Sequence, residues 1–220
     1  MFSIIFWIIA FVVAITVHEA SHAWMSDHLG DPTAKLEGRL SLNPLKHYDP
    51  VGTTLLLVLV FMRAIIGPAV IPFGWAKPVG FDPYNLKNPR KDTALISLAG
   101  PAANLIVAGI LAIALRLTQD PFSSYFWLSS LILEPIIILN VSLAIFNLIP
   151  IHPLDGGKII VGILPKKDAY EFDRFISRFG TLILILLIFP TVGGSSPISL
   201  VMGPVINFIL KILIPGGNLF

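Results

Sequence analysis

The sequence predicts an all-α polytopic membrane protein, with about five to six transmembrane helices and a re-entrant hairpin or short β-strands near residues 51–80. Three observations lead to this fold class. Of the 220 residues, 55% are hydrophobic and 13% are charged, whereas a soluble domain carries about 25% charged residues. The mean hydropathy is +0.84. Several apolar runs are also long enough to cross a bilayer, which takes about 20 residues of helix.

Composition also limits the domain organisation and the available chemistry. No polar stretch exceeds about 30 residues, so we expect one integral-membrane domain over 1–220, with a core in 1–160 and C-terminal helices in 179–214. The chain has no cysteine, so a transition metal must be bound by His, Asp or Glu. The net charge of +2 carries no nucleic-acid signature, so no nucleic acid is expected as a partner.

The first half of the chain contains one clear membrane helix and one weaker apolar run. Residues 2–28 are predicted to form a long helix, retained in the membrane because it lacks the basic leader and cleavage site of a signal peptide. Residues 29–50 are rich in turn-forming residues and predict a polar loop. Residues 51–66 are apolar but short, and the Pro and Gly residues in 67–80 forbid a continuous helix.

The second half contains two further runs of spanning length, 93–117 and 128–149. Pro135 interrupts the later run near its beginning and is a candidate for its true helix start. Residues 158–178 form a basic amphipathic stretch. Two shorter apolar runs follow, at 179–192 and 198–214.

Within the first apolar run lies the motif His18-Glu19-Ala20-Ser21-His22. On a helix, residues four apart leave the same face, about 6 Å apart along the axis. Two imidazoles in this arrangement can chelate one Zn²⁺, and the glutamate can act as general base for a water molecule held by the ion. The composition gives on the order of 0.002 chance matches to this motif, so coincidence explains it poorly.

A catalytic zinc needs a third protein ligand and an open position. The residues alone leave several candidates: Asp27, His28, His47, Glu134, His152 and Asp155. His47 lies in a polar loop, where a solvated histidine is the ordinary interpretation. Asp155 precedes two glycines, and taken alone an ordinary Asp-Gly turn explains it better than a metal ligand does.

The motif at His18 combines with a second pattern late in the chain, Asn147-x-x-Pro150-x-x-x-Leu154-Asp155-Gly156. Together they resemble the site-2 protease family of intramembrane zinc metalloproteases. Residues 38–50, 74–79 and 99–104 resemble its short prokaryotic branch, which lacks a PDZ domain. The resemblance spans roughly residues 10–160.

The resemblance implies a site and a reaction. His18, His22 and Asp155 would bind one zinc ion per chain, Glu19 would activate water, and Asn147 would orient substrate or stabilise the oxyanion. The substrates would be transmembrane proteins or peptides, cleaved in or near their membrane segments, in regulated intramembrane proteolysis or in clearance of signal-peptide remnants. The location would be the plasma or inner membrane of a prokaryotic cell, in contact with the lipid bilayer.

The shared ion constrains the topology. Asp155 and the histidines must lie at one membrane depth, and both motifs lie near the C-terminal ends of their helices. The first helix and the helix ending near Asn147 should therefore run parallel, although two apolar runs intervene. The weaker run, 51–66, contains Arg63 and is predicted to dip into the membrane and return, where protein or a cavity satisfies its backbone.

The distribution of basic residues supports this topology. Under the hairpin arrangement, twelve Lys and Arg residues share one side, in loops 29–50, 74–92 and 158–178. The segments on the other side carry none. Because basic loops stay in the cytoplasm, we expect the N-terminus outside and the active site toward the cytoplasmic face.

The alternative function is a membrane metal transporter, since intramembrane His and Asp can also form a transit site. Two observations oppose it. Glu19 would have no role in such a site, and the sequence shows neither an inverted repeat nor paired broken helices.

Overall fold

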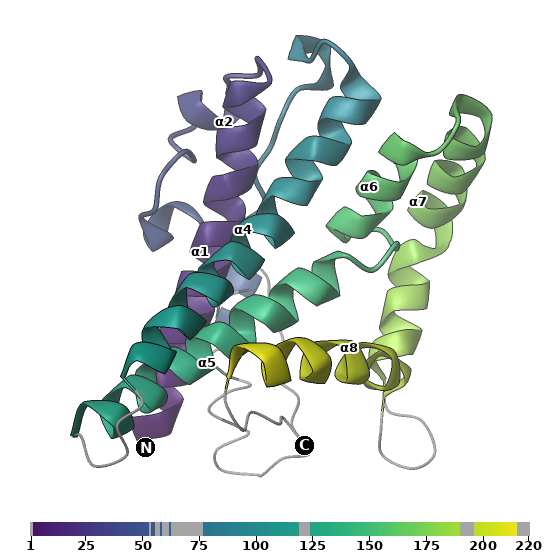
Figure 1. The fold of residues 1–220 in the computed structure, drawn as a ribbon. Helices are drawn as coiled ribbons and strands as arrows, with labels where there is room; N and C mark the ends of the chain where they lie inside the picture. Colours follow the sequence, from purple (N-terminus) through teal and green to yellow (C-terminus); the bar gives the residue numbers. More distant parts are fainter. Residues whose placement is uncertain are drawn as a thin grey trace.

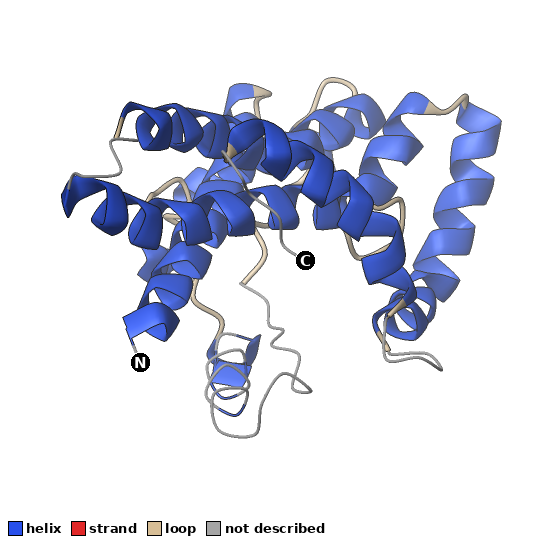
Figure 2. Ribbon diagram, turned by 60° about the horizontal axis from the view of Figure 1, so that its bottom comes forward, coloured by secondary structure: helices blue, strands red, loops and turns tan. Residues whose placement is uncertain are grey.

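The computed structural model describes residues 2–52, 77–118, 124–189 and 196–214, together with 54, 55, 58 and 62. These residues form helices and connecting turns, and none of them lies in a β-strand (Figure 2). The predicted all-α fold is therefore confirmed. The hairpin or strands expected near 51–80 lie largely outside the described residues.

Three helices are long and apolar enough to cross a membrane, judged over the described residues. They are α1 (Phe2–His28), α4 (Pro89–Leu117) and α5 (Ser124–Asn147). Their apolar stretches match the predicted spans. An apolar run in lipid forms a helix because a helix satisfies all of its own backbone hydrogen bonds. The predicted start of α5 at Pro135 is wrong. The helix begins at Ser124 and continues through this proline, which membrane helices tolerate.

Helix α4 lies at the centre of the bundle. It packs against α1, α5 and α6, and more lightly against α8. In Figure 1, α1 runs upward, α4 runs downward beside it, and α5 returns toward the upper end. Helices α1 and α5 therefore share a direction, as the shared-ion argument requires. A buried apolar cluster joins α4, α5 and α8, with members Ala108, Ala112, Leu115, Ile137, Val141, Ile206 and Leu210.

The C-terminal part consists of α6 (Asp155–Ile163), α7 (Lys166–Ile188) and α8 (Pro197–Leu213). Helix α7 joins the predicted basic stretch and the following apolar run into one continuous helix. Helix α8 has 17 residues and crosses the lower end of the bundle in Figure 1. Both supply shorter apolar segments than the three long helices.

The segment between α1 and α4 leaves and returns at the same end of the bundle. It contains the short helices α2 (Thr33–Leu36), η1 (Pro44–Lys46) and η2 (Pro83–Asn85). The amide of Lys77 donates to the carbonyl of His47 at 3.0 Å. Two backbone positions 30 residues apart in sequence thus lie side by side.

Asp31 joins three parts of this end of the molecule. Its buried carboxylate accepts hydrogen bonds from Ser26 at the end of α1, from Thr33 in α2, and from the Asp82 amide and Asn85 side chain before α4. Burial alone would raise the pKa of Asp31, but these hydrogen bonds stabilise the anion and lower the pKa to about 2. This carboxylate holds the loop against the end of the bundle.

Candidate metal centre and active site

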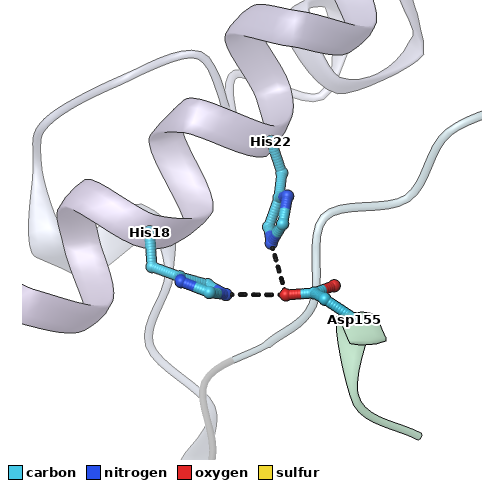
Figure 3. A group of neighbouring side chains, drawn as sticks. All are labelled: His18, His22 and Asp155. Atoms are coloured by element: carbon cyan, nitrogen blue, oxygen red, sulfur yellow. Dashed lines mark hydrogen bonds and ion pairs between the residues drawn. The ribbon is translucent and has the colours of Figure 1, made fainter. Parts of the chain in front are cut away.

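Three side chains that are distant in sequence meet inside the bundle (Figure 3). His18 and His22 project from α1, and Asp155 is the first residue of α6. One carboxylate oxygen of Asp155, Oδ2, lies 3.1 Å from His18 Nε2 and 3.2 Å from His22 Nε2. Relative exposures are 4%, 8% and 8%, so the cluster is shielded from solvent.

The two imidazoles converge because of the helix period. Their ring centroids lie 4.6 Å apart with an interplanar angle of 90°, as expected for residues one turn apart on one face. The possible ligand atoms of the three side chains all lie within 4.8 Å of one another. The structure thus brings together the three residues that the family resemblance implies as ligands.

The tautomer of His22 follows from its second ring nitrogen. Nδ1 lies 2.7 Å from the carbonyl oxygen of Ile96 in α4. A carbonyl only accepts hydrogen bonds, so Nδ1 carries the proton. In the neutral ring, the Nε2 lone pair then points at the Asp155 carboxylate.

The tautomer of His18 follows in the same way from Asn104. His18 Nδ1 lies 2.7 Å from Asn104 Oδ1. The Asn104 amide nitrogen donates to the carbonyl of Ala14 at 2.9 Å, which leaves its oxygen facing the ring. His18 therefore also carries its proton on Nδ1 and directs a lone pair from Nε2 toward Asp155.

This donor set fits a cation. Two nitrogen lone pairs and one carboxylate oxygen face each other, and a bound cation would compensate all three at once. Tetrahedral zinc, with bonds of about 2.0–2.1 Å, places its ligand atoms about 3.3 Å apart. The two measured separations of 3.1 and 3.2 Å are close to that value. Both histidines also have the second hydrogen bond that zinc-binding histidines almost always make.

Asp155 reaches the histidines through a tight turn. Residues 148–154 connect α5 to α6, and Gly156 follows directly. A Cβ atom at Gly156 would lie 2.3 Å from the carbonyl oxygen of Ile149 and 2.4 Å from that of Leu148. Glycine is therefore required for the connection to fold back so closely, and this gives the Leu-Asp-Gly pattern its structural reason.

Gly100 gives α4 its close approach to the histidines. A Cβ atom there would lie 2.6 Å from His22 Nε2 and 2.7 Å from His18 Cε1. Both distances are far below van der Waals contact. The rings therefore pack directly against the backbone of α4, the same helix that supplies the Ile96 carbonyl and Asn104.

Glu19 is held by the segment that enters the site from the polar loop. Glu19 Oε2 accepts a hydrogen bond from the Val79 amide at 3.1 Å. The buried guanidinium of Arg39 donates to the carbonyls of Lys46 and Lys77 at 2.7 and 3.3 Å. Arg39 therefore anchors the segment that orients the carboxylate of Glu19.

Asn147 lies at the end of α5, and its side chain forms a hydrogen bond within its own helix. Its amide nitrogen donates to the carbonyl of Leu143 at 3.0 Å. The side chain is partly buried. A role toward substrate requires this amide to leave the Leu143 carbonyl.

The other candidate ligands lie elsewhere. Asp27 pairs with Lys35 at 3.1 Å, and His28 stacks on Trp24. Glu134 lines a cavity of about 350 Å³ between α1 and α5. The expectation of a solvated His47 is wrong: it is 1% exposed, and its Nε2 lies 2.8 Å from the Ser41 carbonyl.

His152 lies in the connection before α6, outside the cluster of three ligand candidates. Its backbone packs closely against Gly180 of α7. Its part is therefore in the packing of the connection.

The sequence by itself indicates no individual role for Gly100, Asn104 or Asn140. Asn104 and Asn140 are both fully buried within membrane helices. A polar side chain in the middle of an apolar span is a usable signal, because its burial is costly unless it is paired. The partners themselves depend on helix packing and are not visible in the sequence.

A family profile and several similar proteins point to the same protein family. The sequence profile described as Peptidase family M50 matches residues 124–187. The chain is 35% identical over 214 residues to "Putative zinc metalloprotease YwhC" of Bacillus subtilis, which covers 91% of this chain and 85% of that protein. It is 32% identical over 184 residues to "Putative zinc metalloprotease Rip2" of Mycolicibacterium smegmatis, over 82% of this chain and 65% of that protein.

A more distant relative comes from an archaeon. The chain is 28% identical over 190 residues to "Zinc metalloprotease MJ0392" of Methanocaldococcus jannaschii, covering 84% of this chain and 43% of that protein. No solved structure matches. The predicted resemblance, the enzyme class and the dependence on zinc are confirmed by these relatives. Given its three apolar helices and its identity to YwhC over most of both sequences, the chain is an integral membrane protein of the Peptidase M50 (site-2 protease) family of zinc metalloproteases.

Proposed function

We propose that this protein hydrolyses peptide bonds in or near the transmembrane segments of membrane proteins, with one zinc ion held by His18, His22 and Asp155. The observation that carries the proposal is the convergence of three lone pairs in a buried site on a membrane helix. Such a site requires a cation, and hydrolysis is the chemistry that a zinc ion with a neighbouring glutamate performs.

The chain supplies the proton transfers. Zinc, when bound, acts as a Lewis acid that polarises the scissile carbonyl and makes water more acidic. Glu19 takes the proton of the attacking water and returns it to the leaving amine. The hydrogen bond from the Val79 amide to Oε2 fixes the orientation of its carboxylate.

The depth of the site indicates the substrate class. His18 and His22 lie within the Ile5–His28 span, so a peptide reaching them must enter the membrane region. A helical substrate hides its carbonyls in its own hydrogen bonds, so it must be locally extended before cleavage. Asn147 would then release the Leu143 carbonyl and donate to the developing oxyanion.

The proposed orientation places the site near the cytoplasmic face. The polar end of the bundle carries Lys35, Lys46 and Lys77. The end of α6 packs against the start of α4 at Gly162, which brings the basic start of α7 to the same end. Basic residues gathered at one end support a cytoplasmic location for that end. Substrates in regulated proteolysis or signal-peptide clearance would then be cleaved close to the cytoplasm.

The test compares Glu19→Gln with a matched control, Glu37→Gln, which removes an exposed carboxylate from the polar loop. Each variant is co-expressed with a library of single-pass membrane proteins and signal-peptide remnants, and cleavage products are identified by mass spectrometry. Zinc content is measured on the purified proteins. We expect products from the wild type and Glu37→Gln, none from Glu19→Gln, and equal zinc in all three.

Two outcomes would count against the proposal. Cleavage by Glu19→Gln at the wild-type rate would refute the proposed role of Glu19 as general base. Zinc transport into proteoliposomes that survives this substitution, without any cleavage, would favour the metal transporter.

A further inference from the structure

Two asparagines form a polar path through the apolar bundle to the metal centre. Asn104 lies on α4 and Asn140 on α5, and both are 0% exposed. The possible ligands identified above are His18, His22 and Asp155. Buried amides in membrane helices are costly unless each hydrogen-bonding group is satisfied, so their arrangement calls for an explanation.

The hydrogen bonds along this path have a fixed direction. Asn140 Nδ2 donates to the Ile136 carbonyl at 2.8 Å, and Asn140 Oδ1 accepts from Asn104 Nδ2 at 2.7 Å. The Asn104 amide also donates to the Ala14 carbonyl at 2.9 Å, which leaves Asn104 Oδ1 to accept from His18 Nδ1 at 2.7 Å. Backbone carbonyls cannot donate, so reversing either amide would place two acceptors face to face.

We infer that Asn104 and Asn140 are positioning residues that hold His18 in the tautomer able to bind metal. Asn104 accepts the proton on Nδ1, and Asn140 keeps Asn104 facing the right way without touching the histidine. The inference rests on the proposed metal site, because it concerns how that site is prepared for its ion.

Different groups fix the tautomers of the two histidines. The proton on His22 is fixed by the Ile96 carbonyl, part of the α4 backbone. The proton on His18 is fixed by side chains. Substitution at Asn104 therefore affects the tautomer of His18 directly, whereas the preparation of His22 does not depend on any side chain on α4.

A purely structural role for the asparagines makes a different prediction. Interhelical amide hydrogen bonds also join membrane helices, and such a role depends on the donors of Asn104 toward Ala14 and Asn140. Asn104→Asp removes those donors but keeps an acceptor toward His18. Asn104→Leu removes both. The tautomer role is rescued by aspartate, and the structural role is not.

The experiment reads the tautomer without zinc. Protein labelled with ¹⁵N-histidine in detergent micelles is stripped of metal, and NMR distinguishes protonation at Nδ1 from protonation at Nε2. The His18 signal is assigned by its loss in His18→Gln. Zinc affinity is then measured by competition with a chromogenic chelator. Leu115→Ala, which removes a buried apolar side chain from the same helix, controls for lost stability.

We expect Nδ1 protonation of His18 in the wild type and in Asn104→Asp, with zinc affinities within a few fold of each other. Asn104→Leu should shift the ring toward Nε2 protonation and weaken zinc binding by roughly 10- to 100-fold. Asn140→Leu should shift both readouts in the same direction by a smaller amount. Leu115→Ala should lower the melting temperature and leave both readouts unchanged.

An unchanged His18 tautomer in both leucine variants would overturn the inference. Equal loss of zinc affinity in Asn104→Asp and Asn104→Leu would overturn it as well, in favour of a structural role. If Asn104→Leu does not fold, Asn140→Leu decides the matter. Failure of the wild type to bind zinc would instead refute the proposed metal site, and the tautomer measured in metal-free protein keeps the two failures distinguishable.

Discussion

The sharpest prediction concerns Gly100, where α4 touches the rings of both proposed histidine ligands. Gly100→Ala adds one methyl group, and its Cβ would lie 2.6 Å from His22 Nε2 and 2.7 Å from His18 Cε1. Carbon atoms in contact prefer about 3.5–4.0 Å. The rings or the helix must therefore move by about 0.8 Å or more to relieve the overlap.

The free-energy cost of Gly100→Ala depends on whether the two histidine rings can move away from the added methyl group. Both rings are tied to α4 by hydrogen bonds of 2.7 Å, so they cannot move away from this helix without breaking these contacts. Overpacking of this kind costs about 1–3 kcal/mol. Because the overlap falls on one proposed ligand atom, His22 Nε2, and on a ring carbon of His18, most of this cost should weaken zinc binding, by on the order of 10- to 100-fold.

The assay is zinc affinity of the purified protein by chelator competition, together with cleavage in the co-expression screen. Gly109→Ala is the matched control, since it lies on the same helix with nothing within 4 Å of the added Cβ. Alanine at that position should be neutral or slightly stabilising, because glycine lowers helix stability by about 1 kcal/mol. Wild-type zinc affinity in Gly100→Ala would refute the assignment of this packing to the metal site.

Three further outcomes are expected. Asp31→Asn should lower the free energy of unfolding by about 1–3 kcal/mol, measured by thermal or denaturant unfolding. Because folding lowers the pKa of Asp31 from 3.8 to about 2, its contribution should be complete above pH 4 and lost as the pH falls toward 2, and the Asn variant should lack this pH dependence. Arg39→Gln should reduce cleavage by roughly tenfold with zinc content unchanged; loss of zinc would contradict the proposed anchoring role. The chain has no native cysteine, so Lys46→Cys and Lys166→Cys can be labelled singly, and both should react with an impermeant maleimide from the cytoplasmic side; labelling from opposite sides would refute the topology.

Much of the architecture could be predicted because it depends on local sequence. Apolar length alone indicates the three long helices, since lipid leaves a helix no alternative for its backbone. The four-residue spacing of His18 and His22 places both rings on one face whatever the rest of the chain does. The start of α5 could not be placed in the same way, because Pro135 breaks helices in water and is tolerated in the membrane.

The third ligand was open on residues alone and became specific through its paired motif. Asp155 is 137 positions from His18, and no local rule connects them. What brings them together is a turn that requires glycine at position 156 and the packing of α6 on α4. The burial of His47, expected to be solvated, was missed for the same reason, because its surroundings come from segments that fold over it.

By itself, the sequence determined the membrane environment, the helical fold class, and the pair of histidines with its neighbouring glutamate, since each follows from composition or from helix period. Only the tertiary structure decided which nitrogens face the proposed metal site, because the protons on His18 and His22 are held by Asn104 and the Ile96 carbonyl, 86 and 74 positions away. The tertiary structure also explains the glycine at position 100, because α4 approaches both rings too closely there for a larger residue. Tautomer and contact distance depend on which helices touch, and that packing is set by the whole bundle.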